Sequence, residues 1–150
     1  MSLTAVPMLC YGPPPGERVA VNLAASLFDV ARRQPAAPAV SGSLHAWSYR
    51  ELAQRVSCLA GGLVACGLQS GDRVMLCMEN CAEFLELMFA CWTAGLCAVP
   101  VNARLHPREV EHIAKDCGAR LLVATWTGER ARSARAIGRD LVVNHCDRVR

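Results

Sequence analysis

The most apolar part of the chain starts with the short run Val74–Met78, which follows turn residues. A run of this length between turns is typical of a strand that is buried on both faces. The segment Cys81–Ala94 is apolar except for one narrow stripe of polar side chains, Glu83, Glu86 and Thr93. We therefore expect a helix that is covered by other parts of the protein on nearly all sides, with this stripe as its only solvent-exposed face. The run Cys97–Val101 then completes a strand–helix–strand unit with parallel strands and a right-handed crossover.

The segments upstream of this unit predict two helices and a hairpin. Asn22 is a suitable N-cap for the first helix, and Ser48 with Glu51 forms a capping box at the start of the second. Leu52, Val56 and Leu63 lie on one apolar stripe of that second helix. The predicted ranges are Leu23–Arg33 and Tyr49–Cys66 for the helices, and Ala39–Gly42 with Leu44–Trp47 for the hairpin.

Downstream, the sequence predicts a helix at Pro107–Cys117, with Pro at its first position, His106 at its N-cap and Gly118 just past its end. The remaining patterns predict a strand at Arg120–Ala124, a short arginine-bearing helix at about Glu129–Ile137 and a last strand at Leu141–Val143. These elements predict an α/β fold, in which a layered, mostly parallel sheet carries helices on both faces.

Composition and charge narrow the classes of function. The chain has 150 residues, of which 53% are hydrophobic, and a formal net charge of +3. Residues 1–125 hold ten basic and ten acidic side chains, whereas residues 126–150 hold six arginines against three acids. The body is thus neutral, which argues against a nucleic-acid footprint. The longest uncharged apolar run, Leu87–Ala103, contains Gly95 and Pro100, so a core helix followed by a strand explains it better than a membrane span.

The nine cysteines include no Cys-x-x-Cys pair, and several lie within apolar runs. Zinc sites need closely spaced pairs or a histidine cluster, so we expect structural, reduced cysteines and a cytoplasmic protein. The N-terminus also lacks the pattern of a signal peptide.

No phosphate-binding Gly-rich motif and no nucleophile elbow occurs in the sequence. His106 and His112 are six residues apart, which differs from the spacing of a helical metal pair, and a general base beside Glu109 or Glu111 stays open. Glu83 and Glu86 could form an acid–base pair, although a wet stripe is the simpler interpretation. Arg132, Arg135 and Arg139 share one helical face that could hold a phosphate, although a solvated face is the simpler interpretation there too. His45 and His145 have no catalytic context.

Several short blocks resemble the early part of AMP-forming acyl-CoA synthetases, in the adenylate-forming (AMP-binding) superfamily. The resemblance runs from about Leu23 to Thr125, and the order and spacing of the blocks carry it. The blocks are Trp47–Leu52, Gly71-Asp72-Arg73-Val74, Glu79-Asn80, Glu83-Phe84, Ala94-Gly95, Val99-Pro100-Val101-Asn102, Leu105–Glu109 and Gly118-Ala119-Arg120. Asn102 is common in CoA ligases at a position where peptide-synthetase adenylation domains more often carry Asp.

The resemblance implies ATP-dependent activation of a carboxylic or fatty acid through an acyl-adenylate, followed by thioester formation with CoA. It also implies that the full-length enzyme uses ATP, Mg and CoA. The family's Ser/Thr/Gly-rich loop ending in Pro-Lys-Gly, its magnesium-binding glutamate and its C-terminal domain with the catalytic lysine have no counterpart here. The resemblance therefore transfers no catalytic, cofactor-binding or metal-binding residue to this chain.

We expect residues 1–20, which include Pro13-Pro14-Pro15, to be a disordered leader, and residues 21–150 to be an incomplete N-terminal AMP-binding-enzyme domain. The expected protein is a truncated ligase segment that binds no cofactor and is inactive alone. It should self-associate or aggregate, because it would expose an apolar patch and an open sheet edge. Two alternatives stay open: a non-catalytic interaction module that reuses the scaffold, and a flavodoxin-like nucleotide binder.

Overall fold

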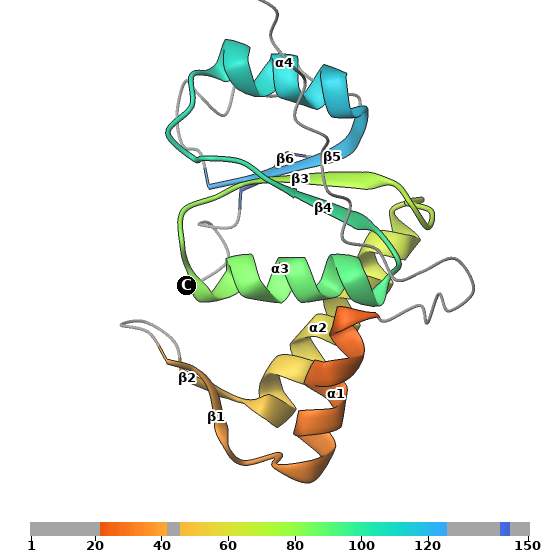
Figure 1. Cartoon of the computed structure of the whole chain (residues 1–150), viewed down its shortest axis with the longest axis vertical. Helices are drawn as coiled ribbons and strands as arrows, with labels where there is room; N and C mark the ends of the chain where they lie inside the picture. The colour runs from red at the N-terminus through yellow and green to blue at the C-terminus, as the bar shows by residue number, and fades with distance from the viewer. Residues whose placement is uncertain (1–21, 42–45, 126–141, 145–150) are drawn as a thin grey trace, which may run out of the picture.

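The computed structural model describes residues 22–41, 46–125 and 142–144 (Figure 1). Four helices and six strands alternate along this part of the chain. The helices are α1 (Leu23–Arg33), α2 (Tyr49–Ala65), α3 (Ala82–Thr93) and α4 (Pro107–Cys117). The strands are β1 (Pro38–Ser41), β2 (Ala46–Ser48), β3 (Arg73–Cys77), β4 (Cys97–Pro100), β5 (Ala119–Ala124) and β6 (Val142–Asn144).

A parallel sheet of four strands in the order β4-β3-β5-β6 forms the centre of the protein. Val74 of β3 stands opposite Ala98 of β4 on one side and Leu121 of β5 on the other. The predicted α/β fold is confirmed, and the element bounds agree with the expected ones to within one or two residues. The predicted hairpin is present as the antiparallel pair β1–β2, which forms a separate sheet.

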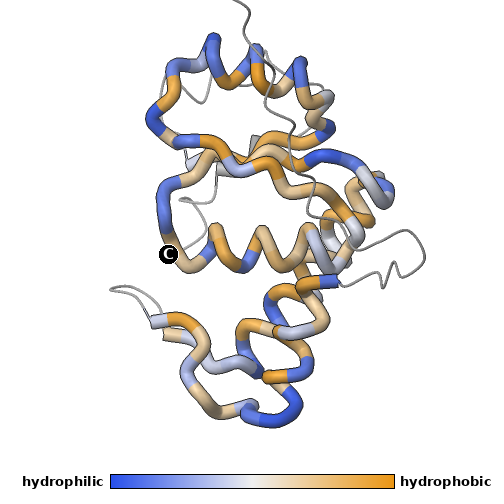
Figure 2. The backbone as a smooth tube through the Cα atoms, viewed as in Figure 1, coloured by the Kyte–Doolittle hydropathy of each residue, from blue (hydrophilic) through white to orange (hydrophobic). Residues whose placement is uncertain are grey.

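The sheet has a hydrophobic core on each face, because successive side chains of a strand point to opposite sides. Val74, Leu76 and Met78 face α2 and α3, where Leu87, Ala90 and Cys91 join their cluster. Met75 and Cys77 face the other way and pack with Val110 of α4. Figures 1 and 2 show α3 and α4 on opposite sides of the sheet, with hydrophobic residues along the strands between them.

Helix α3 is covered as expected, but the predicted wet stripe is wrong. Glu86 is only 6% exposed, and its carboxylate accepts a hydrogen bond from Arg55 on α2 at 2.9 Å. The Arg55 guanidinium also lies over the ring of Trp47, 4.2 Å from its centroid. The exposed position of α3 is instead Leu85, at 43%. Glu86 faces inward because α2 packs against α3 and supplies a cation for it, which helical periodicity could not show.

Helix α1, the hairpin and α2 share a smaller core around Leu27, Leu52 and Val56. Their predicted caps are confirmed. The Asn22 side chain accepts a hydrogen bond from the Ala24 N–H at 2.9 Å, and Glu51 accepts one from the Ser48 N–H at 2.8 Å. Such caps satisfy backbone donors that have no partner within the helix.

Three predicted features lie outside the described residues: the leader at 1–20, the turn at 42–45 and the arginine-bearing helix at about 129–137. Strand β6 was expected at Leu141–Val143 and is found at Val142–Asn144. Within the described ranges, no helix combines the length and the apolar character needed to cross a bilayer.

Candidate functional site

The connections of the sheet reverse direction between β3 and β4. The chain leaves β3 toward α3 on one face and leaves β4 toward α4 on the other, and β5 then returns to the far side of β3. Loops that follow two adjacent parallel strands and diverge in this way leave a crevice at the carboxyl edge of the sheet. Ligands of open α/β folds bind in such crevices, so the topology marks this edge as a candidate site.

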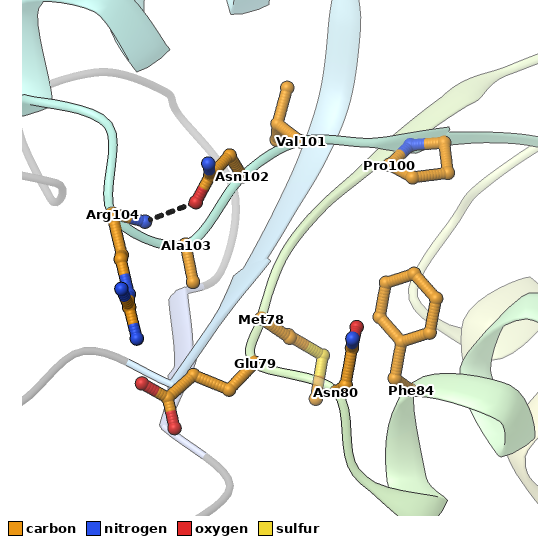
Figure 3. Close-up of a pocket in the computed structure, with 9 residues that line it drawn as sticks. All are labelled: Met78, Glu79, Asn80, Phe84, Pro100, Val101, Asn102, Ala103 and Arg104. Carbon is orange, nitrogen blue, oxygen red and sulfur yellow. Dashed lines mark hydrogen bonds between the residues drawn. The ribbon is translucent and has the colours of Figure 1, made fainter.

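A cleft with a volume of about 690 Å³ lies at this edge (Figure 3). We call it the carboxyl-edge cleft. The loop after β3, the first turn of α3 and the loop after β4 line it with Met78, Glu79, Asn80, Phe84, Pro100, Val101, Asn102, Ala103 and Arg104. Its charged side chains are one carboxylate, Glu79, and one guanidinium, Arg104. The amides of Asn80 and Asn102 add neutral donors and acceptors, so the cleft offers mainly polar recognition.

The loop after β4 has a defined shape. Asn102 Oδ1 accepts a hydrogen bond from the Arg104 N–H at 2.9 Å, and Asn102 O accepts one from the Leu105 N–H at 3.2 Å (Figure 3). The Cys77 thiol donates to the same carbonyl at 3.6 Å. This arrangement is an Asx-turn, in which the side chain replaces part of the backbone bonding.

The loop after β3 is tied to the neighbouring strand and helix. The Glu79 N–H donates to Thr125 Oγ1 at 3.4 Å, just beyond β5. Met78 is 4% exposed and is part of the core, whereas Glu79 and Asn80 are exposed at the cleft. Phe84 contributes a half-buried ring from α3. Rigid elements thus hold an apolar floor below a polar rim.

The residues weighed as candidates from the sequence do not gather at one site. His106 is the N-cap of α4, as predicted: its Nδ1 accepts from the Arg108 N–H at 3.2 Å, and Glu109 accepts from the His106 N–H at 2.8 Å. His112 is exposed on α4. Glu86 is engaged by Arg55, which removes the suggested acid–base pair with Glu83. His45, His145, Arg132, Arg135 and Arg139 lie outside the described residues.

Most cleft residues belong to the family blocks noted in the sequence, but no motif identified them as a site. The available signal was position: Glu79 and Asn80 follow one predicted parallel strand, and Asn102 and Arg104 follow the next. Carboxyl ends of parallel strands meet at one edge, so these residues were bound to be neighbours. The strand order was needed to show that β3 and β4 are adjacent.

The thiols of Cys91 on α3 and of Cys81 at its N-cap are poor nucleophiles. Burial raises the pKa of Cys91 to about 12 and also raises the pKa of Cys81. Because the thiolate is the reactive form, neither side chain is suited to covalent chemistry near neutral pH. All seven cysteines in the described ranges are free.

Metal ligands do not come together in the part of the chain that the structure describes. No group of three or more His, Cys, Asp or Glu side chains there is arranged to hold an ion. We therefore assign no magnesium ligand to the described residues.

A second concavity of about 790 Å³ lies between α1 and α2. Phe28, Ala53 and Cys58 are among its mostly apolar lining. It lies outside the parallel sheet, and its lining also includes the polar side chains Asp29, Arg32, Arg50, Gln54 and Ser57.

Residues 27–148 match the family described as AMP-binding enzyme. The chain is 42% identical over 113 residues to a feruloyl-CoA synthase from an Amycolatopsis species, covering 75% of this chain and 23% of the relative. It is 38% identical over 92 residues to a fatty acid–[acyl-carrier-protein] ligase of Streptomyces coeruleorubidus, covering 61% and 18%. The chain therefore spans about a quarter or less of the length of these curated relatives.

Solved structures show the same fold. The N-terminal domain of FACL13 from Mycobacterium tuberculosis is similar with a TM-score of 0.67 and 30% identity, over 75% of this chain and 28% of that one. A benzoate CoA ligase from Burkholderia xenovorans gives a TM-score of 0.69 at 22% identity, over 76% and 23%. At that identity the second likeness concerns the fold alone.

Proposed function

This chain belongs to the AMP-binding enzyme family, and we propose that it forms the first part of the N-terminal domain of an acid–CoA ligase. The observation that carries the proposal is the 42% identity to a feruloyl-CoA synthase over 113 residues. The similarity to the N-terminal domain of a second family member supports the placement within the fold. Neither a non-catalytic interaction module nor a flavodoxin-like nucleotide binder receives support from these similarities.

The proposed reaction has two steps. The carboxylate of the acid attacks the α-phosphorus of ATP, which forms an acyl-adenylate and releases pyrophosphate. The thiol of CoA then attacks the acyl carbon, which forms a thioester and releases AMP and a proton. Magnesium bound in such an enzyme would neutralise phosphate charge. The described residues supply no ligand set for it.

We propose that the carboxyl-edge cleft contributes to binding an anionic cosubstrate. Both ATP and CoA carry several phosphate charges, and Arg104 provides the cleft with a guanidinium that suits phosphate oxygens. The amides of Asn80 and Asn102 provide neutral hydrogen-bonding groups beside it. The Glu79 carboxylate offsets the positive charge of Arg104. The cleft should therefore recognise one oriented phosphate group and not attract anions in general. The cleft's role is positioning, since the nucleophiles of the proposed reaction are the acid carboxylate and the CoA thiol, and none is needed from the protein.

We further propose that residues 1–150 do not catalyse adenylation on their own, bind no cofactor alone and act in the cytoplasm, where free thiols persist. The sequence contains neither a Gly-rich phosphate loop nor a Pro-Lys-Gly segment. Preorganised donors around the transferring group are each worth about 10²–10³ in rate, so a segment without them should show no measurable turnover. The division into a leader at 1–20 and a domain at 21–150 is part of the same proposal.

A chimera tests the ligase assignment. The 113-residue stretch of the Amycolatopsis feruloyl-CoA synthase that aligns with this chain is replaced by the sequence of this chain. The chimera should form feruloyl-CoA from ferulate, ATP and CoA, because we propose that this chain supplies the same part of the fold as the stretch it replaces. The unmodified relative serves as the positive control, and circular dichroism confirms that the chimera is folded. A folded but inactive chimera would contradict the proposal.

A further inference from the structure

We propose that Asn102 is a positioning and specificity-determining residue for the anionic cosubstrate. Its side chain shapes the turn that presents Arg104 to the carboxyl-edge cleft. Because the Asn102 amide is uncharged, it does not offset the positive charge of Arg104. This inference rests on the proposed ligase function, in which Arg104 contacts a phosphate.

The turn is built from both ends. Asn102 Oδ1 holds the Arg104 N–H at 2.9 Å, and Asn102 O receives the Leu105 N–H at 3.2 Å and the Cys77 thiol at 3.6 Å. The side chains of Val101 and Leu105 pack into the core between the sheet and α4. The turn therefore has anchored flanks, and its tip, Ala103 and Arg104, is directed to the cleft (Figure 3).

Immediately after the turn, α4 begins with its own cap. The His106 imidazole and the Glu109 carboxylate satisfy backbone donors of the first turn, at 3.2 and 2.8 Å. The Glu109 carboxylate accepts the His106 N–H in that cap. It is therefore not the acceptor of the Arg104 N–H, which bonds to Asn102 instead. The cap of α4 thus leaves the hydrogen bond to the Arg104 N–H to the Asn102 side chain.

The choice of amide over carboxylate follows from charge. Asp could accept the same hydrogen bond from the Arg104 N–H, because Asn and Asp both form Asx-turns. It would also add a negative charge to a cleft whose described lining contains the Glu79 carboxylate and a single cation, Arg104. A phosphate that approached Arg104 would then meet net repulsion. Asn supplies the turn without that charge.

Four variants separate the two parts of this inference: Asn102→Ala, Asn102→Asp, Asn102→Ser and Arg104→Gln. The first readout is hydrogen exchange of the Arg104 amide, followed by NMR on the full chain. Asn102→Ala should speed this exchange about threefold or more, since a hydrogen bond worth about 1 kcal/mol is lost. Asn102→Asp should leave the exchange close to wild type, and Asn102→Ser should restore part of the protection. Equal exchange in wild type and Asn102→Ala would overturn the positioning role.

The second readout uses the chimera and compares apparent KM values for ATP and for CoA, which tells the two possible phosphate sources apart. Asn102→Asp should raise the KM for ATP or the KM for CoA about three- to tenfold, and this change should exceed any fall in kcat. A change of this size is expected for one added charge near a phosphate at a high effective dielectric constant. The control Arg108→Gln removes an exposed cation next to the site on α4 that is not part of the cleft lining, and it should leave both KM values unchanged. Unchanged KM values in Asn102→Asp would overturn the specificity role.

Failure of the proposed function gives a different result. If Arg104→Gln leaves both KM values unchanged, the phosphate contact assigned to the cleft is wrong, while the exchange data still test the turn. If the chimera is folded but inactive, titration with inorganic tripolyphosphate compares the chimera that keeps the wild-type Asn102 with its Asn102→Asp variant. Wild type should then bind about threefold or more tightly than Asn102→Asp. Equal affinity, or no binding by wild type, would overturn the electrostatic part.

Discussion

The guanidinium of Arg73 on β3 donates from Nη2 to the carbonyl oxygen of Gly118, 2.7 Å away and just past the end of α4. Its Nε donates to Cys117 O at 2.9 Å and its Nη1 to Gly71 O at 3.1 Å. Carbonyls at a helix C-terminus have no intrahelical partner and favour a cation. Gly118 has a φ of +62°, and a Cβ there would lie 2.9 Å from Arg73 Nη2. The Gly71-Asp72-Arg73-Val74 block thus fastens α4 to the amino edge of the sheet, away from the cleft.

Replacing Arg73 by Gln should lower the free energy of unfolding by about 1–3 kcal/mol, because hydrogen bonds from a charged group to helix-end carbonyls are lost. Urea denaturation followed by circular dichroism measures this change. Arg120→Gln is the matched control. Its guanidinium is 4.0 Å from Asp72 and its side chain is 55% exposed, so a change within about 0.5 kcal/mol is expected. Equal effects of the two substitutions would contradict the role of Arg73.

Removing Arg55 should destabilise the protein by about 1–3 kcal/mol, because the buried Glu86 carboxylate loses its cation. Arg55→Met combined with Glu86→Leu should recover most of this loss, since two apolar side chains leave no unpaired charge. A double-mutant cycle from urea denaturation gives the coupling free energy. Additive single-site effects would show that the contact between α2 and α3 does not depend on the pair.

The Ser48–Glu51 capping box should contribute to stability only above the acid range. The backbone hydrogen bond from Ser48 holds the pKa of Glu51 below its usual value, with the Ser48 hydroxyl as a second cause. Because the folded-state pKa is lowered, the contribution is present above the unfolded value and is lost as pH falls through the folded value. Glu51→Gln should flatten this part of the pH–stability curve, measured by thermal unfolding between pH 7 and pH 3. The comparison variant is Glu111→Gln. It removes a carboxylate that pairs with Lys115 on the surface of α4 and takes no part in a helix cap.

The β4 edge of the sheet is protected by Pro100. The N–H groups of Cys97 and Val101 donate to Asp72 O, just before β3, and to Leu76 O on β3, at 2.8 and 3.0 Å. The backbone nitrogen of Pro100 therefore faces away from β3. Proline has no N–H to offer to another strand. Pro100→Thr should therefore increase self-association of residues 1–150, measured by analytical ultracentrifugation. Unchanged sedimentation would show that the edge is covered in another way.

The wild-type chain is also expected to self-associate when it is produced alone. In the described ranges its exposed large hydrophobic side chains are Leu23, Val64 and Leu85, at 57%, 53% and 43%. Leu85→Gln should reduce association and dye binding to apolar surface if α3 provides the contact. A sharp monomer that binds no dye would contradict the expectation.

Purified residues 1–150 should show no acid-dependent exchange between ATP and pyrophosphate, with short, medium or long acids or with ferulate. The physical reason is that the sequence contains neither a Gly-rich phosphate loop nor a Pro-Lys-Gly segment. The Amycolatopsis relative, assayed in parallel, controls for the conditions. Exchange above background by this chain would refute the proposal of inactivity.

The sequence by itself determined the elements and their layers. The apolar run before α3, the capping box at Ser48 and Glu51, and Pro107 with Gly118 around α4 are local signals, because turns, caps and periodicity depend on neighbouring residues. The family blocks were equally local. Most of them could be recognised without knowing that Arg73 holds α4 to the sheet.

Only the tertiary structure decided how distant segments meet. The strand order β4-β3-β5-β6 places the loops after β3 and β4 side by side and so creates the cleft of Glu79, Asn102 and Arg104. It also buries Glu86 against Arg55, where periodicity had predicted a wet face. Pairing of strands and of buried charges depends on contacts across many residues of sequence. No local pattern encodes those contacts, because many pairings are compatible with the same helices and strands.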